Sequence, residues 1–196
     1  MLANEHVRNF IRNMTECVAE PQPEAARVAC ARELMAGLIS RDDWLPDEFA
    51  APHPQYYQQY LLYCDPLERF SLVSFIWGPG QKTPVHNHTV WGLIGMLRGA
   101  EISQRYEPDG EGRPMRVLER TRLEPGDIEL VSPTEGDIHD VENAFADRVS
   151  VSIHLYGANI GAVRRAIFDP VTGAAKPFIS GYASPHLPNF WDRSRD

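Results

Sequence analysis

Two histidines separated by a single residue are the first feature of the sequence that could do chemistry. His86 and His88 fall in a segment that is typical of a β-strand, Thr83–Val90. Residues two apart on a strand point to the same face, so both imidazoles are expected to project together. Two imidazoles held this way form half of a transition-metal site, which His139 would complete. The alternative is a pair of surface histidines on an exposed strand.

A second polar row lies further along the chain. Ser152, His154 and Tyr156 alternate with three apolar residues in the predicted strand Val149–Tyr156. The two sets occupy opposite faces of that strand. A row that faces water needs no special role. If the apolar face packs against an outer layer, the row points inward. Ser152 can then orient His154, and His154 can polarise the Tyr156 hydroxyl.

The elements that must position these residues are mostly short strands. Apolar residues at helical spacing predict one helix around Val7–Val18 and another over Glu24–Ile39, and a third short helix is expected over about Pro54–Tyr60. The predicted strands are Tyr60–Tyr63, Phe70–Trp77, Thr83–Val90, Leu93–Leu97, Ala100–Tyr106, Met115–Arg122, Asp127–Val131, Asp137–Val141 and Val149–Tyr156. Gly, Pro and Asp separate them, which favours a sandwich or small barrel over βαβ units.

The 196 residues are expected to form one domain, residues 1–196. Its parts would be a helical segment over about 4–60, a β-barrel over about 61–170 and a C-terminal tail over 171–196. The tail is rich in Gly, Ala and Pro from Thr172 onward and is expected to wrap the surface.

Composition excludes several classes of function. The net charge is −8, and the 17 arginines are scattered without a basic run, so neither nucleic acid nor an anionic membrane is an expected partner. No segment reaches the roughly 18 apolar residues of a membrane span, and the first residues lack a signal-peptide pattern. We therefore expect a cytoplasmic protein. Cys17, Cys30 and Cys64 form no C-x-x-C pair and are expected to be buried, reduced thiols.

Glycines and a proline around the histidines resemble the two signature motifs of the cupin superfamily. The matching positions are Gly80, His86, His88, Gly99, Gly126, Pro133, Gly136, His139 and Asn143. The resemblance implies a mainly β fold, a small antiparallel jelly-roll barrel preceded by the N-terminal helices. Cupins commonly supply a glutamate four residues after the second histidine, where this chain has Gly92. Three neutral histidines would leave the metal's charge for an anionic ligand such as a thiolate.

With the Ser-x-His-x-Tyr row added, most of residues 55–170 resembles the thiol dioxygenases of the cysteine dioxygenase family. These are mononuclear non-haem iron(II) enzymes that add both atoms of O2 to a thiol and give a sulfinate. The implied metal ligands are His86, His88 and His139, with one iron(II) per chain. The implied catalytic row is Ser152, His154 and Tyr156. A small thiol and O2 are the implied partners, and the oligomeric state is left open.

Two positions indicate the bacterial branch of the family, typified by 3-mercaptopropionate dioxygenase. Gly92 stands where mammalian members carry the cysteine that crosslinks to the tyrosine, so no thioether is expected. Gln59 stands where those members hold the substrate carboxylate with an arginine. In the bacterial branch a later arginine does so, and Arg165 matches it, with Arg164 as the neighbour that could take its place. The expected reaction is 3-mercaptopropionate to 3-sulfinopropionate. The alternatives are L-cysteine, mercaptosuccinate or cysteamine, or a metal-binding cupin with another role.

Overall fold

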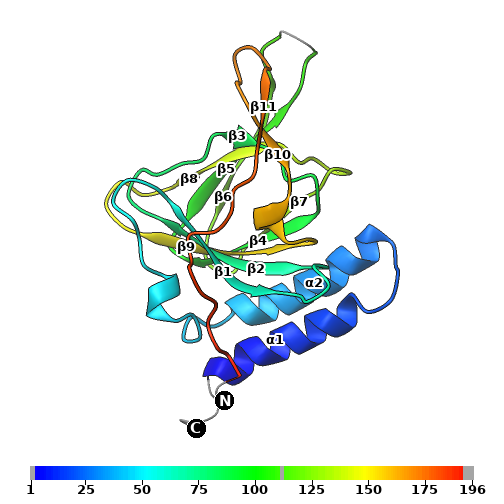
Figure 1. Ribbon diagram of the computed structural model, residues 1–196. Coiled ribbons are helices and arrows are strands. Elements are labelled where there is room, and N and C mark those ends of the chain that lie inside the picture. Colours follow the sequence, from blue (N-terminus) through cyan, green and yellow to red (C-terminus); the bar gives the residue numbers. More distant parts are fainter. Residues whose placement is uncertain (1–2, 111–112, 192–196) are drawn as a thin grey trace.

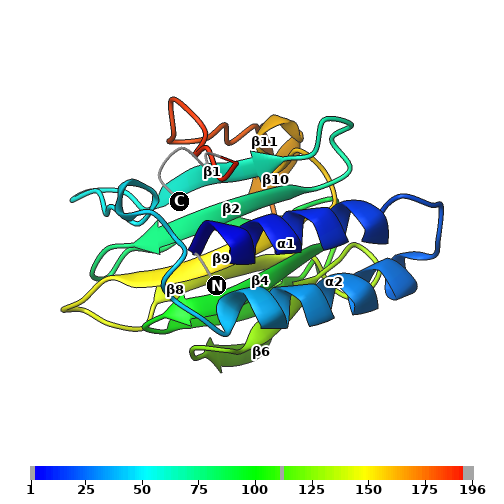
Figure 2. The same ribbon diagram turned by 90° about the horizontal axis from the view of Figure 1, so that it is seen from below.

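Two helices precede the strands in the computed structural model, which describes residues 3–110 and 113–191 (Figure 1). Helix α1 spans Ala3–Cys17 and α2 spans Glu24–Ile39, so both predicted helices are confirmed. Pro23 directly precedes α2, where its missing N–H costs no helical hydrogen bond. The helices lie side by side across one face of a sheet (Figure 2). Neither helix is long and apolar enough to cross a bilayer, and no other helix in the described ranges is.

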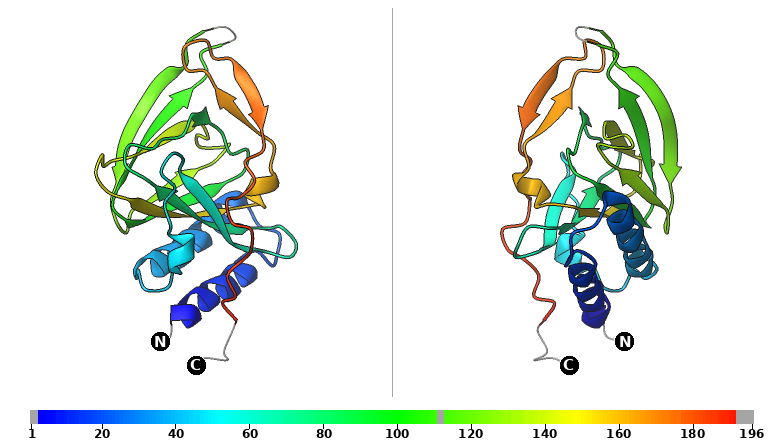
Figure 3. Two further views of the ribbon diagram at one scale, coloured as in Figure 1. Left: turned by 60° about the vertical axis from the view of Figure 1, so that its left-hand side comes forward. Right: turned by 90° about the vertical axis from the view of Figure 1, so that its right-hand side faces the viewer.

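The sheet beneath the helices has five antiparallel strands in the order β1-β2-β9-β4-β7. These strands are β1 (Gln58–Cys64), β2 (Ser71–Trp77), β9 (Ser150–Tyr156), β4 (Gly92–Arg98) and β7 (Ile128–Val131). A six-stranded antiparallel sheet lies on the side away from the helices, in the order β11-β10-β3-β8-β5-β6 (Figure 3). Its strands are β11 (Ala175–Phe178), β10 (Arg165–Phe168), β3 (Val85–His86), β8 (His139–Asn143), β5 (Glu101–Glu107) and β6 (Arg116–Leu123).

The central strand β9 is buried on both faces. Val151, Ile153 and Leu155 pack into the core formed with α1 and α2, so the outer layer that covers them is the helix pair. The alternating polar residues of β9 therefore face the second sheet. This arrangement selects the inward orientation of the polar row over the solvated one.

The mainly β fold preceded by helices is confirmed, but the barrel is not closed. Within the described part of the chain, the two sheets share no strand. The predicted helix over Pro54–Tyr60 is wrong, because Gln58–Tyr60 pair with β2 as the start of β1. A short 3-10 helix lies earlier, at Asp47–Phe49. The pairing satisfies these backbone groups and suits the tyrosines, which favour strands.

Two further expectations, one in mid-chain and one in the C-terminal segment, are corrected by the structure. The strand expected over Thr83–Val90 is reduced to Val85–His86, and Thr89 has a positive φ of 60° that ends the extended backbone. The segment after Thr172 does not only wrap the surface, because Ala175–Phe178 add an edge strand against β10.

The cysteine prediction is wrong for two of the three residues. Cys17 and Cys30 are paired in a disulfide with a Cα–Cα distance of 6.4 Å. The turn between α1 and α2 reverses the chain and brings the two positions within the usual range for such a pair. Cys64 is free and half-buried.

Candidate metal centre

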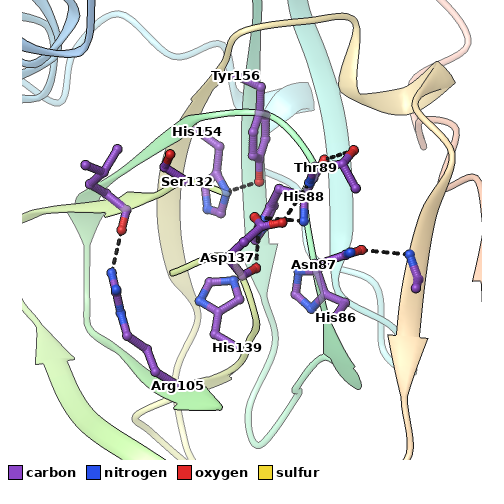
Figure 4. A network of polar contacts seen from close by, with 12 residues as sticks. His86, Asn87, His88, Thr89, Arg105, Ser132, Asp137, His139, His154 and Tyr156 are labelled. Carbon is purple, nitrogen blue, oxygen red and sulfur yellow. Dashed lines mark hydrogen bonds and ion pairs between the residues drawn. The ribbon is translucent and has the colours of Figure 1, made fainter. Parts of the chain in front are cut away.

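Three histidine side chains converge in the space between the two sheets (Figure 4). His86 ends β3 and lies opposite His139, the first residue of β8. His88 follows two residues after His86, beyond the end of the strand. One ring nitrogen from each residue lies within 4.8 Å of the other two. The structure therefore brings together all three residues predicted as metal ligands.

The Nδ1 atom of each ring is already engaged with the protein. Nδ1 of His86 lies 3.0 Å from the Pro84 carbonyl oxygen, and Nδ1 of His139 lies 3.1 Å from Ser103 Oγ. Nδ1 of His88 lies 3.2 Å from both the carbonyl oxygen and Oδ1 of Asp137. A neutral imidazole that donates from Nδ1 keeps its Nε2 lone pair for a metal. Three such lone pairs suit a metal ion.

Electrostatics keep these rings in the form that binds a metal. Burial holds the pKa of His86 and of His139 well below the usual histidine value, and the neighbouring His88 lowers both further. These two rings are therefore neutral at physiological pH. Among the described residues, the candidate ligand group consists of three histidines and includes no carboxylate. A divalent ion bound here would therefore keep its full charge.

Asp137 anchors the segment that carries His88. Its carboxylate accepts hydrogen bonds from the backbone N–H of His88 at 3.0 Å and of Thr89 at 2.9 Å. These bonds replace the strand pairing that His88 lacks and stabilise the positive φ of Thr89. The sequence analysis missed Asp137. The sequence signal for this role was an acidic residue two positions before His139. Metal-binding histidines commonly donate a hydrogen bond from their second ring nitrogen to a carboxylate.

The polar row of β9 lies beside the three histidines as a hydrogen-bonded series. Ser152 Oγ is 2.9 Å from His154 Nε2, and His154 Nδ1 is 2.8 Å from the Tyr156 hydroxyl. The Tyr156 ring stacks against His88 with centroids 5.6 Å apart. Burial lowers the pKa of His154 and raises that of Tyr156, so both side chains are neutral. The row brings a phenol to the edge of the three-histidine group.

Gly92 lies directly against that phenol. A Cβ built on Gly92 would come within 2.6 Å and 2.8 Å of two Tyr156 ring carbons. The resemblance compares this position with a glutamate in cupins and a crosslinking cysteine in mammalian members, but here the Tyr156 ring occupies the space that a side chain would need.

Replacing Gly92 by alanine is expected to displace Tyr156 and slow turnover. Overpacking of this kind costs about 1–3 kcal/mol, and a misplacement of about 1 Å at a reacting group can cost roughly a hundredfold in rate. Thermal melting and steady-state kinetics would measure both effects. Gly37→Ala is the matched control, because nothing lies within 4 Å of a Cβ there and alanine favours the helix. A Gly92→Ala enzyme with unchanged stability and rate would contradict the close approach.

Arg165 and Gln59 meet at one serine of the C-terminal segment. Arg165 begins β10, is buried, and donates from a terminal nitrogen to Ser180 Oγ at 2.7 Å. Gln59 donates to the same Oγ at 3.2 Å and to the Gly181 carbonyl oxygen at 2.9 Å. Gln59 also lines a surface cavity of about 360 Å³ with Tyr57 and Tyr182. Burial lowers the pKa of Arg165, whose charge also acts on Tyr156.

The two neighbouring arginines face different surroundings. Arg164 is exposed and borders a separate hollow beside Phe178, whereas Arg165 turns inward. The guanidinium of Arg165 also lies 4.7 Å from the centroid of the Phe178 ring. Of this pair, Arg165 is therefore the one whose charge reaches the polar row. The sequence analysis missed Ser103 and Ser180, because each lies far in sequence from the group it contacts.

Fold and site together define a cupin-type β protein with three histidines placed to hold a metal ion. Residues 7–168 match the sequence profile of the family described as cysteine dioxygenase type I. The chain belongs to this family and is a thiol dioxygenase.

Two solved structures show distant likeness to the chain. One is a conserved protein with a double-stranded β-helix domain from Klebsiella pneumoniae, with 19% identity, 59% of this chain and 89% of that chain covered, and a TM-score of 0.46. The other is a cupin superfamily protein from Desulfitobacterium hafniense, with 13% identity, 56% and 84% covered, and a TM-score of 0.42. Nothing about substrate follows from either likeness.

Proposed function

We propose that this chain oxidises a small carboxylate-bearing thiol to its sulfinic acid, with iron(II) held by His86, His88 and His139. Three neutral imidazoles suit a divalent first-row transition metal, and the family implies iron. Bound iron(II) would supply the redox chemistry that lets O2 react with a closed-shell thiol. The overall reaction is RSH + O2 → RSO2H. Both oxygen atoms bond to sulfur, whose electrons reduce O2, so no further reductant is needed.

The observation that carries the substrate class is the buried guanidinium of Arg165. Its Nε is buried without a hydrogen-bond partner among the described residues, whereas buried polar groups are normally paired. A carboxylate could accept from Nε and a terminal N–H in parallel, which is the strongest pairing available to arginine. That pairing would also fix the reach from carboxylate to sulfur.

We further propose 3-mercaptopropionate as the preferred substrate and 3-sulfinopropionate as its product. The Gln59 amide is bonded to Ser180 and Gly181, which leaves Arg165 as the cation for a single carboxylate. Asp137, the carboxylate nearest the histidines, is already bonded to His88 and Thr89. The α-amino group of L-cysteine would therefore lie near the positive guanidinium of Arg165, with no free carboxylate of the described residues to pair with it. L-cysteine is the second candidate, because the matched family is named for it.

The polar row supplies the remaining chemistry from the protein. Tyr156, held by His154, presents a hydroxyl beside His88. This hydroxyl can donate a hydrogen bond to the oxygen that gains negative charge on sulfur as the sulfinate forms. Tyr156 and His154 are buried, which limits the contact of the hydroxyl with water.

Oxygen uptake by the iron(II)-loaded protein tests the proposal. We expect rapid uptake with 3-mercaptopropionate, slow uptake with L-cysteine, and one sulfinate formed per O2 consumed. Faster uptake with L-cysteine would keep the reaction but overturn the substrate. The absence of uptake with any small acidic thiol, at one iron per chain, would favour a metal-binding cupin with another role.

A further inference from the structure

Glu101 is a buried acid that the proposed chemistry leaves unused. It begins β5, and its side chain is 0% exposed. Neither carboxyl oxygen has a hydrogen bond of standard geometry to any described residue. Its polar neighbours are Ser152 and Trp77, so the carboxyl lies at the end of the row opposite Tyr156. A buried, unpartnered acid next to a catalytic row needs a reason, since burying such a group is costly.

We propose that the Glu101 carboxyl is a positioning group that sets the direction of the hydrogen bonds running from Ser152 through His154 to the Tyr156 hydroxyl. The inference rests on the proposed function in one respect, namely that Tyr156 serves the reaction. The inference is drawn from the hydrogen-bond donors and acceptors of Ser152, His154 and Tyr156.

Ser152 has one hydrogen to give and two lone pairs to fill. Trp77 Nε1 donates to its Oγ at 3.0 Å and fills one lone pair. His154 is neutral and therefore carries one ring proton, on Nε2 or on Nδ1. His154 takes either the second lone pair or the hydrogen of Ser152. In the proposed role, Glu101, the carboxyl next to Ser152, takes the one that remains. Two arrangements follow from this assignment.

In the first arrangement Glu101 is protonated and donates to Ser152. Ser152 then donates to His154 Nε2, and Nδ1–H donates to the Tyr156 oxygen. The hydroxyl hydrogen of Tyr156 is left free to donate toward the metal centre. In the second arrangement Glu101 is ionised and accepts from Ser152. His154 then donates from Nε2, its Nδ1 accepts from Tyr156, and the Tyr156 hydrogen is no longer available to a substrate.

The protein's electrostatics favour the first arrangement at neutral pH. Burial, together with the charge of Glu129 on β7, raises the pKa of Glu101 to about 8. Glu129 itself pairs with Arg105 Nε at 3.1 Å. Asn143, opposite Glu101 on β8, has its amide bonded to the Trp77 and Gly78 carbonyl oxygens. Glu101 therefore keeps its proton near pH 7 and loses it as the pH rises.

The pH profile of turnover is the first test. We expect kcat of the wild-type enzyme to fall as the pH rises through about 8, because ionised Glu101 reverses the row. Glu101→Gln cannot ionise, so its kcat should lack this alkaline limb, and Glu101→Leu should lack it too. Glu129→Gln should move the limb to lower pH, because it removes a negative charge that opposes ionisation. A limb that persists in both Glu101 variants overturns the proposal.

A second test reads the row directly and does not depend on turnover. In the full chain labelled with 15N-histidine and loaded with diamagnetic zinc(II), NMR reports which ring nitrogen of His154 carries the proton, assigned with His154→Gln. We expect Nδ1–H at pH 7 and Nε2–H at pH 9.5, and Nδ1–H at both pH values in Glu101→Gln. An unchanged His154 spectrum alongside normal oxygen uptake overturns this inference alone. The expected change without oxygen uptake from any thiol overturns the proposed function and supports the inference.

Discussion

Replacing His139 by alanine is expected to remove most of the bound iron and, with it, turnover. His139 is one of three imidazoles whose ring nitrogens lie within 4.8 Å of one another, and no carboxylate in that group can compensate for it. Loss of a partner that only orients a metal ligand costs about 10–100-fold in metal affinity. Loss of the ligand itself is expected to exceed that. Metal analysis after dialysis and oxygen uptake would measure both quantities.

A graded series makes the His139 experiment specific. Ser103→Ala removes only the oxygen that lies 3.1 Å from His139 Nδ1, so it should weaken iron binding by about 10–100-fold and leave the ligand in place. His186→Ala is the control, because His186 is exposed and lies outside the site. Full iron content and activity in His139→Ala would remove His139 from the metal centre. Loss of iron in His186→Ala would make the effect nonspecific.

The grouping of the three histidines was predictable from two signals. His86 and His88 share one short segment, whereas His139 was placed beside them by the resemblance of the glycine, proline and histidine spacing to the cupin motifs. The row of β9 was predictable because alternation along one strand shows which residues share a face. Its inward direction needed the knowledge that α1 and α2 cover Val151, Ile153 and Leu155.

The contacts that orient the site were not predictable, because they join distant parts of the chain. Ser103 reaches His139 across the β5–β8 pairing, and Ser180 reaches Arg165 from the segment after β11. Glu101 looked like an ordinary strand residue until the fold placed it beside Ser152. The Cys17–Cys30 pair depended on how the two helices meet, which spacing alone does not state.

The two sheets divide the site's tasks between them. In the six-stranded sheet, β3 and β8 carry His86 and His139, while Ser103 on β5 fixes one ring. In the five-stranded sheet, β9 carries the phenol and the groups that orient it. Glu101 projects from the six-stranded sheet toward the polar row on the five-stranded sheet. A change on β5 can therefore alter either metal binding or tyrosine orientation, depending on which residue it replaces.

Replacing Arg165 is expected to have its largest effect on substrates with a carboxylate. Arg165→Met keeps much of the side-chain volume but removes the charge, and breaking a buried, hydrogen-bonded charge pair costs about 2–5 kcal/mol. The KM for 3-mercaptopropionate should therefore rise by about a hundredfold or more. Arg165→Lys should recover only part of this loss, because a lysine lacks the planar fork that meets both carboxylate oxygens. Steady-state oxygen uptake would measure these constants.

Two comparisons separate a carboxylate clamp from a packing role. The neutral analogue 3-mercapto-1-propanol should be a poor substrate of the wild-type enzyme and should change little in Arg165→Met, because it has no carboxylate to lose. Arg164→Met should behave as wild type, since Arg164 is exposed and faces away from the polar row. An equal loss for the acid and the alcohol would mean that Arg165 supports the fold of β10 instead of the substrate. A loss in Arg164→Met restricted to the acid would move the clamp to that residue.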